Sequence, residues 1–277
     1  DVIKVERVPG GDDTRRMTPP EIDGESAAFM MLNRNKRGIA LDLKTDGGHD
    51  VLSRLARGAD VIIENFRKGA MERLGFGYEA LAADNPGLIF AAISGFGRSG
   101  PYSERGGYDL IAQGMSGLMS ITGEGPGRAP VKIGAPIADH NAGILAALGI
   151  VSAYVHRLKT GHGQFLDTSL FEASISTTFH QSAMFFATGV VPAPLGSAHP
   201  LSAPYQGYQT ADGWITIGAA NQSLWIRLCE ALGEPALTQD PRFATNDDRM
   251  ANLEALNAAL APLFAARTTE ASLAMLE

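Results

Sequence analysis

The chain has 277 residues, of which 45% are hydrophobic and 19% charged, and its formal net charge is −7. This composition fits a globular protein with one large domain, or with one large and one small domain. The acidic balance argues against a dedicated nucleic-acid-binding protein, which usually has a basic face, and no apolar run of about 18–20 uncharged residues predicts a membrane span. The single cysteine, Cys229, excludes an intrachain disulfide bond and favours a reducing compartment, for which we expect the cytoplasm.

Strands and helices alternate over the first part of the chain. The hydrophobic pattern predicts strands at DVIKVERV (1–8), GIALDL (38–43), VIIEN (61–65) and LIFAAIS (88–94). Between them, DGGHDVLSRLARGA has apolar side chains at helical spacing, and GAMERLGF and YEALAAD are predicted to be short helices. This alternation is typical of α/β proteins, so we predict a parallel sheet with helices on its faces.

A long helix is predicted from Gly143 to Arg157, and its side chains are apolar nearly all round. A helix with this pattern is expected to be largely buried. GQFLDTSL (163–170) then predicts a strand, and FEASISTTFHQSAMFFATG (171–189) predicts one further helix.

The character of the sequence changes near residue 190, where VVPAPLGSAHPLSAP is rich in proline and predicts a linker. Beyond it, a hairpin is predicted around Ala211-Asp212-Gly213, followed by a helix at LWIRLCEALG and a helical region from Ala251 to Ala265. We therefore predict a large domain over 1–190, a linker over 191–204 and a smaller α+β domain over 205–277. Because the chain opens on a strand and stops inside a helical pattern, we also expect it to be truncated at both ends.

GFGRSG (95–100) matches the G-x-G-x-x-G pattern of dinucleotide-binding folds and follows a predicted strand. That pattern needs a helix that opens at its third glycine and holds the pyrophosphate. Here Pro101 and Tyr102 follow, and no helix is predicted, so an NAD-dependent dehydrogenase is a weak interpretation. A glycine loop at the carboxyl end of a strand is still a good position for a lid over a ligand.

Several other chemistries lack support in the sequence. There is no C-x-x-C, no H-x-x-E-H and no histidine pair at metal-ligand spacing, so we expect no metal site. No G-x-S-x-G elbow is present for serine catalysis. Cys229 shares an apolar helix face with Ile226 and Leu232 and is predicted to belong to the core.

Basic residues gather near the ends of the first strands and helices. Most such side chains are simply solvated, but a few could bind phosphates, since an acidic protein can bind an anion through a local cluster. The residues concerned are Arg7, Arg34, Lys36, Arg37, Lys44, Arg67, Lys68 and Arg73.

GAPIADHNAG (134–143) places Asp139, His140 and Asn141 before an apolar helical run. An Asp or Asn in this position is an ordinary N-cap, which contributes about 1 kcal/mol. Two observations favour a reactive carboxylate instead. The segment offers two capping candidates, so one could be free, and a helix N-terminus stabilises the ionised form that attacks an electrophile. The local pattern alone does not separate the cap from the nucleophile.

The order of the motifs is similar to that of the family III coenzyme A transferases, the CaiB/BaiF-type family. The resemblance covers essentially the whole chain, and its combination of motifs is highly specific. In that family a strand and a helix precede the first of these motifs. The matching segments are DVIKVER, NRNKRGIALDLK, VIIENFRKGAMERLGFGYE, GYDLIAQGMSG, GAPIADHNAGILAALG, KTGHGQFLDTSLFEA and HPLSAPYQGYQTADGWI.

The resemblance implies that Asp139 is the nucleophile, because the family's catalytic aspartate stands in the motif that reads GAPIADHNAG here. The implied reaction passes through a mixed aspartyl–acyl anhydride and an aspartyl–CoA thioester. An energy-rich bond is conserved at each step, so no ATP, metal or permanently bound cofactor is implied, and coenzyme A takes part as a substrate.

The resemblance also implies a coenzyme A site built from the early motifs. An aromatic ring and a few cations suit an adenine with phosphates. Carried over motif by motif, the residues expected to bind coenzyme A are Arg7, Leu41, Lys44, Asn65, Phe66, Arg73, Leu74 and Arg105.

Tyr108, in GGYDLIAQ, is expected to bind substrate and separates two activities of this superfamily. The related acyl-CoA racemases have a histidine at this place. A tyrosine, whose ordinary pKa is near 10, is a poor base at neutral pH, so Tyr108 favours a transferase. The formyl-CoA transferase branch has a glycine-rich loop where GSAHPLSAPYQ stands here. That difference disfavours oxalate as acceptor and favours succinyl-CoA with glutarate, itaconate or mesaconate.

The resemblance therefore implies an α/β fold, with a Rossmann-like large domain and a small second domain. It implies a coenzyme A transferase that forms an interlocked homodimer and binds an acyl-CoA and a small carboxylic acid, with no nucleic acid or membrane partner. Two alternatives stay open: an acyl-CoA racemase or isomerase on the same fold, and a non-catalytic subunit that binds coenzyme A.

Overall fold

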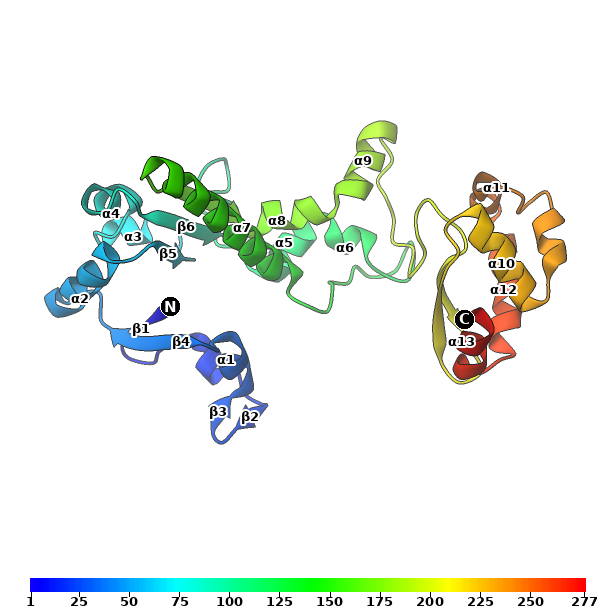
Figure 1. The fold of residues 1–277 in the computed structure, drawn as a ribbon, viewed down its shortest axis with the longest axis horizontal. Helices are drawn as coiled ribbons and strands as arrows, with labels where there is room; N and C mark the ends of the chain where they lie inside the picture. The colour runs from blue at the N-terminus through cyan, green and yellow to red at the C-terminus, as the bar shows by residue number, and fades with distance from the viewer. The chain divides into compact units, whose positions relative to one another are not determined.

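The computed structural model describes residues 1–277, which divide into two compact units (Figure 1). The first unit comprises Asp1–Ser116 and Pro136–Thr177, and the second comprises Gly117–Ala135 and Thr178–Glu277. The proline-rich segment 191–204 lies inside the second unit. The predicted domain boundaries remain a prediction.

The first unit is a mixture of strands and helices in which the main strands run parallel. Its strands are β1 (Val2–Arg7), β2 (Glu21–Ile22), β3 (Glu25–Ser26), β4 (Lys36–Leu41), β5 (Val61–Glu64), β6 (Ile89–Ser94) and β7 (Phe165–Ser169). Its helices are η1 (Asp13–Arg16), α1 (Ala27–Leu32), α2 (Asp46–Arg57), α3 (Ala70–Arg73), α4 (Tyr78–Asp84), α5 (Asp109–Met115), α7 (Ile137–Thr160) and α8 (Leu170–Thr177).

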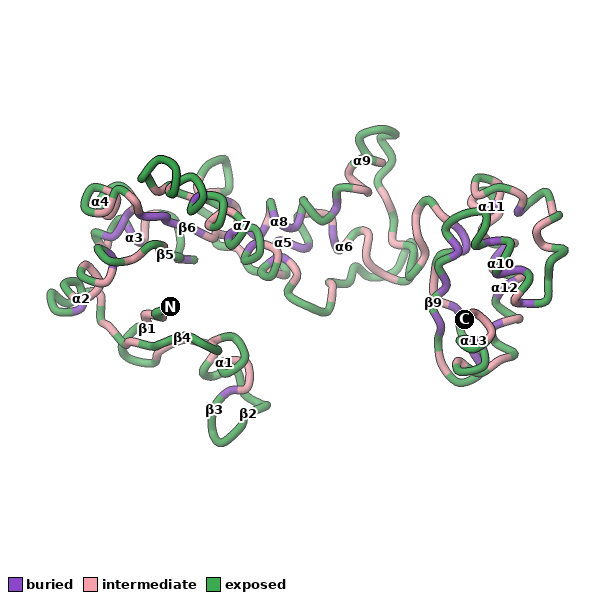
Figure 2. The backbone as a smooth tube through the Cα atoms, in the orientation of Figure 1, coloured by how far each residue is buried: buried purple, intermediate pink, exposed green.

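The parallel strands form two separate sheets. One contains β1 and β4, and the other has the order β5-β6-β7. The sequence pattern predicts a single parallel sheet; periodicity identifies strands but does not determine which of them pair. Strand β6 lies in the middle of its sheet, and Ile89, Phe90, Ala91 and Ala92 are all buried (Figure 2). This explains why LIFAAIS is a continuous apolar run.

Helix α7 begins at Ile137 rather than at Gly143 and is mostly exposed within this chain (Figure 2), so the prediction of a largely buried helix is wrong. The residues that it buries are all alanines, Ala138, Ala142, Ala146 and Ala153. Small residues along one face let the helix approach β6, β7, α5 and α8 closely. The larger apolar side chains lie elsewhere on the helix and are 61% to 69% exposed at Ile144, Leu148, Val151 and Leu158.

By length and composition alone, α7 is long and apolar enough to cross a membrane, although core helices of soluble proteins pass the same test. This differs from the expectation, drawn from runs of uncharged residues, that no segment has this character. Only 17% of the apolar stretch is buried within the chain. A continuous apolar surface of this kind is typical of a contact with another molecule.

The second unit has its own hydrophobic core. Its elements are α6 (Leu118–Ile121), α9 (Phe179–Thr188), β8 (Tyr205–Gln209), β9 (Trp214–Gly218), α10 (Gln222–Leu232), η2 (Pro235–Gln239), α11 (Asn246–Ala251), α12 (Leu253–Ala265) and α13 (Thr269–Leu276). Strands β8 and β9 pair as the predicted antiparallel hairpin. Cys229 is completely buried in this core, as predicted, beside Trp225 and Leu228.

The helix predicted over 171–189 is two helices, α8 and α9, which meet at Thr178. Hydroxyl side chains gather at the break. Ser176 donates a hydrogen bond to the carbonyl oxygen of Ala173, and Thr177 donates to that of Ser174, each at 2.7 Å. Such side-chain bonds to the preceding turn compete with the helical ladder and bend or end helices.

Candidate active site

The carboxyl ends of β5, β6 and β7 lie at one edge of the three-stranded sheet, because the strands are parallel and in register. The Asn65-Phe66 pair follows β5, and the glycine loop 95–100 follows β6. In α/β proteins, ligands bind outside this edge of the sheet. The candidate site is therefore expected among the loops that leave it.

The glycine loop brings the end of β6 against the segment that leads to Tyr108. A β-carbon added at Gly95 would lie 2.6 Å from Cα of Gly107, so neither position has room for a side chain. No helix opens after Gly100, and the next helix, α5, begins at Asp109. The helix that a dinucleotide fingerprint requires is thus absent.

The N-terminus of α7 is capped by Asp109, the first residue of α5. Oδ1 of Asp109 accepts hydrogen bonds from the backbone N–H of Ala138 at 2.8 Å and of Asp139 at 3.4 Å. Oδ2 of Asp109 accepts a bond from Nε2 of Gln113 at 2.7 Å, which fixes the carboxylate on its own helix. A carboxylate from another helix therefore binds the amide groups that an N-cap side chain would normally bind.

Asp139 lies in the first turn of α7, and neither it nor Asn141 caps the helix. The interpretation of this motif as a helix cap is therefore wrong. The residue is exposed, and its carboxylate forms no hydrogen bond or ion pair within the chain. Partial desolvation by neighbouring atoms and the nearby Asp109 carboxylate raise the pKa of Asp139, while His140 opposes this. We expected the helix N-terminus to favour the ionised form, and these surroundings act in the opposite direction.

Tyr108 immediately precedes Asp109 and is 81% exposed. The hydrogen bonds of Asp109 place the start of α5 beside the start of α7, so Tyr108 and Asp139 belong to the same part of the first unit. Both side chains are open to solvent and free to contact a ligand.

Four of the residues predicted to bind coenzyme A lie around the β5–α3 connection. Asn65 and Phe66 follow β5, and Phe66 is 49% exposed. Arg73 ends α3, and its guanidinium folds back over Gly69, where an added β-carbon would lie 2.9 Å from Nη1. Leu74 caps the same helix. The exposed ring of Phe66 and the guanidinium of Arg73 thus lie at the two ends of one short segment that contains α3.

Basic side chains join this connection to the turn that carries Arg105. Lys68 donates a hydrogen bond to Oγ of Ser103 at 3.3 Å and pairs with Glu104 at 3.0 Å. The guanidinium of Arg105 lies over the ring of Tyr102, at 4.2 Å from its centroid. The structure therefore brings the predicted residues at 65–74 together with Arg105 and, farther along the same segment, Tyr108.

Arg7 and Leu41 are register partners at the carboxyl ends of β1 and β4, and Lys44 is exposed just before α2. These three predicted residues belong to the two-stranded sheet, whereas Asn65 and Phe66 belong to the three-stranded one. No hydrogen bond or ion pair links the two groups directly.

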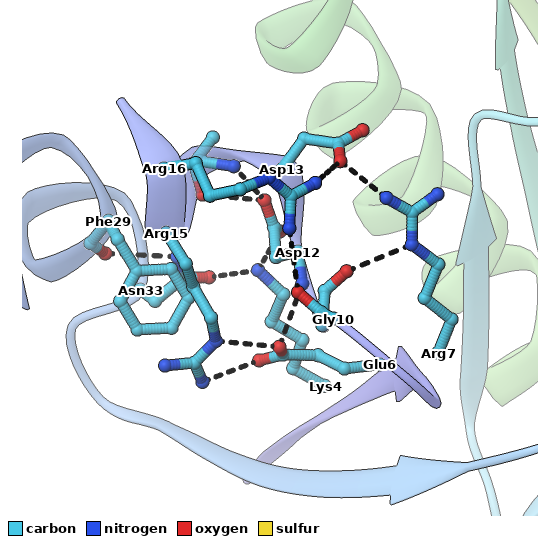
Figure 3. A network of polar contacts seen from close by, with 12 residues as sticks. Lys4, Glu6, Arg7, Gly10, Asp12, Asp13, Arg15, Arg16, Phe29 and Asn33 are labelled. Carbon is cyan, nitrogen blue, oxygen red and sulfur yellow. Dashed lines mark hydrogen bonds and ion pairs between the residues drawn. The ribbon is translucent and has the colours of Figure 1, made fainter. Parts of the chain in front are cut away.

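The Arg7 guanidinium is held by Asp13 (Figure 3). Its Nε also donates a hydrogen bond to the carbonyl oxygen of Gly11 at 3.1 Å, and Arg16 pairs with the same Asp13 oxygen from the other side. The side chains of Arg7 and Asp13 are 61% and 69% exposed. An exposed ion pair of this kind contributes about 0–1 kcal/mol, so an incoming anion can replace Asp13 at low cost.

The loop that carries Asp13 is fixed to β1 by a second set of bonds (Figure 3). Arg15 donates hydrogen bonds to both carboxylate oxygens of Glu6, at 2.8 and 3.0 Å, and lies 3.8 Å above the ring centroid of Phe29. The bond from Arg15 lowers the pKa of Glu6 in spite of its burial. Burial alone would raise the pKa of Asp12, but bonds from Lys4 and Thr14 lower it to about 2.

Sequence reasoning missed three residues at the sheet edge. Asp109 directly follows Tyr108, and Glu64 directly precedes Asn65, so each stands beside a predicted site residue. Arg98 lies inside the glycine loop and forms an ion pair with Glu64. Their position next to chemically informative residues was the only signal, because a pattern of single residues does not reveal which loops meet. No group of three His, Cys, Asp or Glu residues in the chain could hold a metal ion.

Comparison with known proteins places these features in a family. The sequence model of "CoA-transferase family III" matches residues 1–277. The chain is 43% identical to the succinate–glutarate CoA-transferase of Agrobacterium fabrum over 258 residues, which cover 91% of this chain and 64% of that protein. It is 42% identical to the acetyl-CoA:oxalate CoA-transferase of Acetobacter aceti over 261 residues, which cover 93% of this chain and 66% of that protein.

Solved structures agree with this assignment. A CaiB/BaiF family protein from Brucella suis superposes with a TM-score of 0.87 and 43% sequence identity, over 100% of this chain and 74% of that one. The chain spans slightly less than two thirds of the length of the two curated relatives, at 64% and 66%. The chain belongs to the family III CoA-transferases and has their mixed α/β fold with parallel sheets.

Proposed function

We propose that the protein containing this chain is a coenzyme A transferase and that Asp139 is its nucleophile. The observation that carries this proposal is the cap of α7. Because Asp109 accepts the hydrogen bonds of the helix N-terminus, the Asp139 carboxylate has no structural partner and is open to an electrophile. An aspartate in a helix's first turn that neither caps the helix nor forms an ion pair is free to form a covalent intermediate.

The proposed reaction begins when a carboxylate oxygen of Asp139 attacks the thioester carbonyl of the donor acyl-CoA. The carbon–sulfur bond breaks, which gives a mixed anhydride and the coenzyme A thiolate. The thiolate then attacks the aspartyl carbonyl and releases the donor acid as its carboxylate, leaving an aspartyl–CoA thioester. Each step exchanges one activated carboxyl derivative for another, so no outside energy source is required.

The second half of the reaction repeats these steps with the acceptor acid. Its carboxylate attacks the aspartyl thioester and expels the thiolate, forming a second mixed anhydride. The thiolate attacks the acceptor's carbonyl in that anhydride, which yields the new acyl-CoA and returns Asp139 to its carboxylate form. Tyr108, exposed beside the start of α7, is positioned to contact the acyl group rather than to remove a proton.

The proposed coenzyme A site uses the two groups of residues described above. Phe66 offers an exposed ring for the nucleotide or pantetheine, and Arg73 and Arg105 offer charges for phosphates. Asn65, Leu74, Leu41 and Lys44 would line the path. Arg7 would bind a phosphate after releasing Asp13, with which it is paired here.

The proposed substrates are succinyl-CoA and a small dicarboxylic acid. Similarity to a succinate–glutarate CoA-transferase supports this choice. The oxalate enzyme of Acetobacter aceti is almost equally similar, at 42% identity against 43%. Overall similarity therefore does not separate glutarate from oxalate, and both belong among the acceptors tested.

We propose that the protein is a cytoplasmic homodimer, and that a second copy covers the exposed apolar residues of α7. Ile144, Leu148, Val151 and Leu158 leave a large apolar surface in contact with solvent in a single chain. Such a surface is costly unless another molecule covers it. An interlocked arrangement would bury it between two copies of the same chain.

Acyl transfer is tested with the complete protein, succinyl-CoA and a panel of acids comprising glutarate, mesaconate, itaconate and oxalate. We expect a new CoA ester with at least one dicarboxylate, detected by mass spectrometry. Asp139→Asn is expected to abolish its formation because the amide cannot attack the thioester, while coenzyme A binding stays within about twofold. Full transfer by Asp139→Asn would disprove the assignment of Asp139. Exchange of the α-proton in heavy water without transfer would indicate a racemase.

The raised pKa of Asp139 predicts how activity depends on pH. A protonated carboxyl cannot attack, so kcat/KM falls as the pH decreases through the pKa of Asp139, above the ordinary value of about 3.9. Asp109→Asn removes the neighbouring negative charge but keeps an oxygen that can accept the Ala138 N–H bond. The acid limb of the pH profile should therefore move to lower pH. Any titration of the substrate itself is the same for the parent enzyme and the variant. An acid limb that stays in place or moves to higher pH would therefore contradict the role of Asp109.

The contact between Arg7 and Asp13 predicts an increase in affinity. Asp13→Asn removes the carboxylate that competes with a ligand phosphate for Arg7, so coenzyme A should bind more tightly, by up to about fivefold for an exposed pair. Calorimetric titration at low salt measures this, and dephospho-coenzyme A tests whether the 3′-phosphate is the group bound. Asp50→Asn, at an exposed carboxylate on α2 paired with Arg54, is the matched control. Weaker binding by Asp13→Asn would show that Asp13 supports the site.

The proposed dimer is tested by placing charges on α7. Leu148→Lys together with Val151→Lys should convert a dimer into a monomer in analytical ultracentrifugation, because both side chains are exposed in the single chain and buried only by a partner. Ile226→Lys, at an exposed apolar residue of α10, is the control and should leave the dimer intact. A double variant that remains dimeric would place the interface elsewhere.

A further inference from the structure

Glu64 is the last residue of β5 and stands directly before the Asn65-Phe66 pair. Its side chain is only 2% exposed. Oε2 accepts a hydrogen bond from the backbone N–H of Phe66 at 2.7 Å, and Oε1 pairs with Nη2 of Arg98. One carboxylate therefore binds both the beginning of the β5–α3 connection and the glycine loop that follows β6.

Arg98 extends this connection to the third strand. Its backbone N–H donates a hydrogen bond to Oδ2 of Asp167, in β7, at 2.7 Å. The Arg98 side chain is 11% exposed, and its Nε has no hydrogen-bond partner. The only ion pair of Arg98 is the one with Glu64. The Glu64–Arg98 pair and the Asp167 bond join the carboxyl ends of three neighbouring strands.

Packing holds the ring of Phe66 only in part, since the residue is 49% exposed. Its direction is set by the backbone from which it projects, and that backbone is anchored by the bond to Glu64. A hydrogen bond to a charged acceptor is stronger than a neutral one. Burial, with a smaller contribution from the Glu72 carboxylate, raises the pKa of Glu64, and the bonds from Phe66 and Arg98 oppose this rise without cancelling it. The two residues thus favour the ionised carboxylate that the Phe66 bond uses.

We propose that Glu64 and Arg98 are positioning residues for coenzyme A: as a buried pair, they hold the Phe66 loop in the conformation that receives the nucleotide or pantetheine. Neither side chain touches the reacting atoms; each acts through the backbone of Phe66 or of the glycine loop. This inference rests on the proposed function. It assigns a role to two residues that the reaction steps themselves do not use.

A buried ion pair also has an ordinary structural interpretation, in which its loss only lowers stability. The two interpretations differ in kinetics. A stability defect reduces the fraction of active enzyme and leaves the KM of the folded fraction unchanged. A positioning defect raises the KM for acyl-CoA more than that for the acceptor acid, because the acceptor has no nucleotide or pantetheine for the Phe66 loop to bind.

The test uses the complete protein with succinyl-CoA and the acceptor identified by the exchange assay. We expect Glu64→Ala to raise the KM for succinyl-CoA and the Kd for coenzyme A about tenfold, the effect of losing one charge-assisted hydrogen bond. The KM for the acceptor should stay within about twofold. Glu64→Gln keeps an oxygen for the Phe66 N–H and should show a smaller increase. Arg98→Met should resemble Glu64→Ala, and Arg98→Lys should restore part of the affinity.

Two controls make the result decisive. Glu79→Ala removes an exposed carboxylate from helix α4, outside the Phe66 loop, and should leave both KM values unchanged. The double variant Glu64→Ala/Arg98→Met should be no worse than either single variant if the two residues act as one unit. Where an alanine variant fails to fold, Glu64→Gln and Arg98→Lys still report the KM for succinyl-CoA.

An unchanged KM for succinyl-CoA in the folded Glu64 and Arg98 variants would overturn the positioning role and leave the proposed function intact. An equal rise in the KM of both substrates would also overturn it. A parent protein that binds no coenzyme A would instead overturn the proposed function, and this inference with it.

Discussion

The hydrogen bonds that Asp109 accepts at the N-terminus of α7 leave the carboxylate of Asp139 without a partner. Helix N-termini need an acceptor for their free amide groups, and a Ser, Thr, Asp or Asn at the N-cap position often supplies it. Here the acceptor comes from α5, so Asp139 remains in the first turn without a structural task. The same carboxylate contributes to the raised pKa of Asp139. One interaction therefore leaves the proposed nucleophile without a structural partner and raises its pKa.

The carboxyl edge of the three-stranded sheet gathers the other parts of the site. Close packing of Gly95 against Gly107 brings the segment before Tyr108 onto the end of β6. The Glu64–Arg98 pair and the bond to Asp167 connect the loops after β5 and β6 to β7. Buried charges are unusual unless they are paired. Here the paired Glu64 also accepts the backbone N–H of Phe66, so the pair is bonded to the loop that carries this ring.

Much of this could be predicted from the sequence where a periodic pattern was available. The strands at VIKVER, VIIE and IFAAIS, the β8–β9 hairpin and the buried Cys229 all follow from local hydrophobicity. The pairing of the strands could not be predicted from the pattern, and the chain has two parallel sheets where one was expected. The prediction that α7 is largely buried was also wrong, because apolar character alone does not reveal that the residues it buries within the chain are all alanines. The motif around Asp139 indicated the candidate nucleophile, but the cap by Asp109 depends on a contact between distant segments and left no local trace.

Chemical trapping at Asp139 can show whether this carboxylate forms a covalent intermediate. The complete protein is incubated with succinyl-CoA, treated with hydroxylamine, digested and analysed by mass spectrometry. Hydroxylamine converts an activated aspartyl carbonyl into a hydroxamate, so we expect this modification at Asp139 with succinyl-CoA and no modification without acyl-CoA. Transfer of coenzyme A to an acceptor with Asp139 unmodified, or with a hydroxamate on another carboxylate, would contradict it.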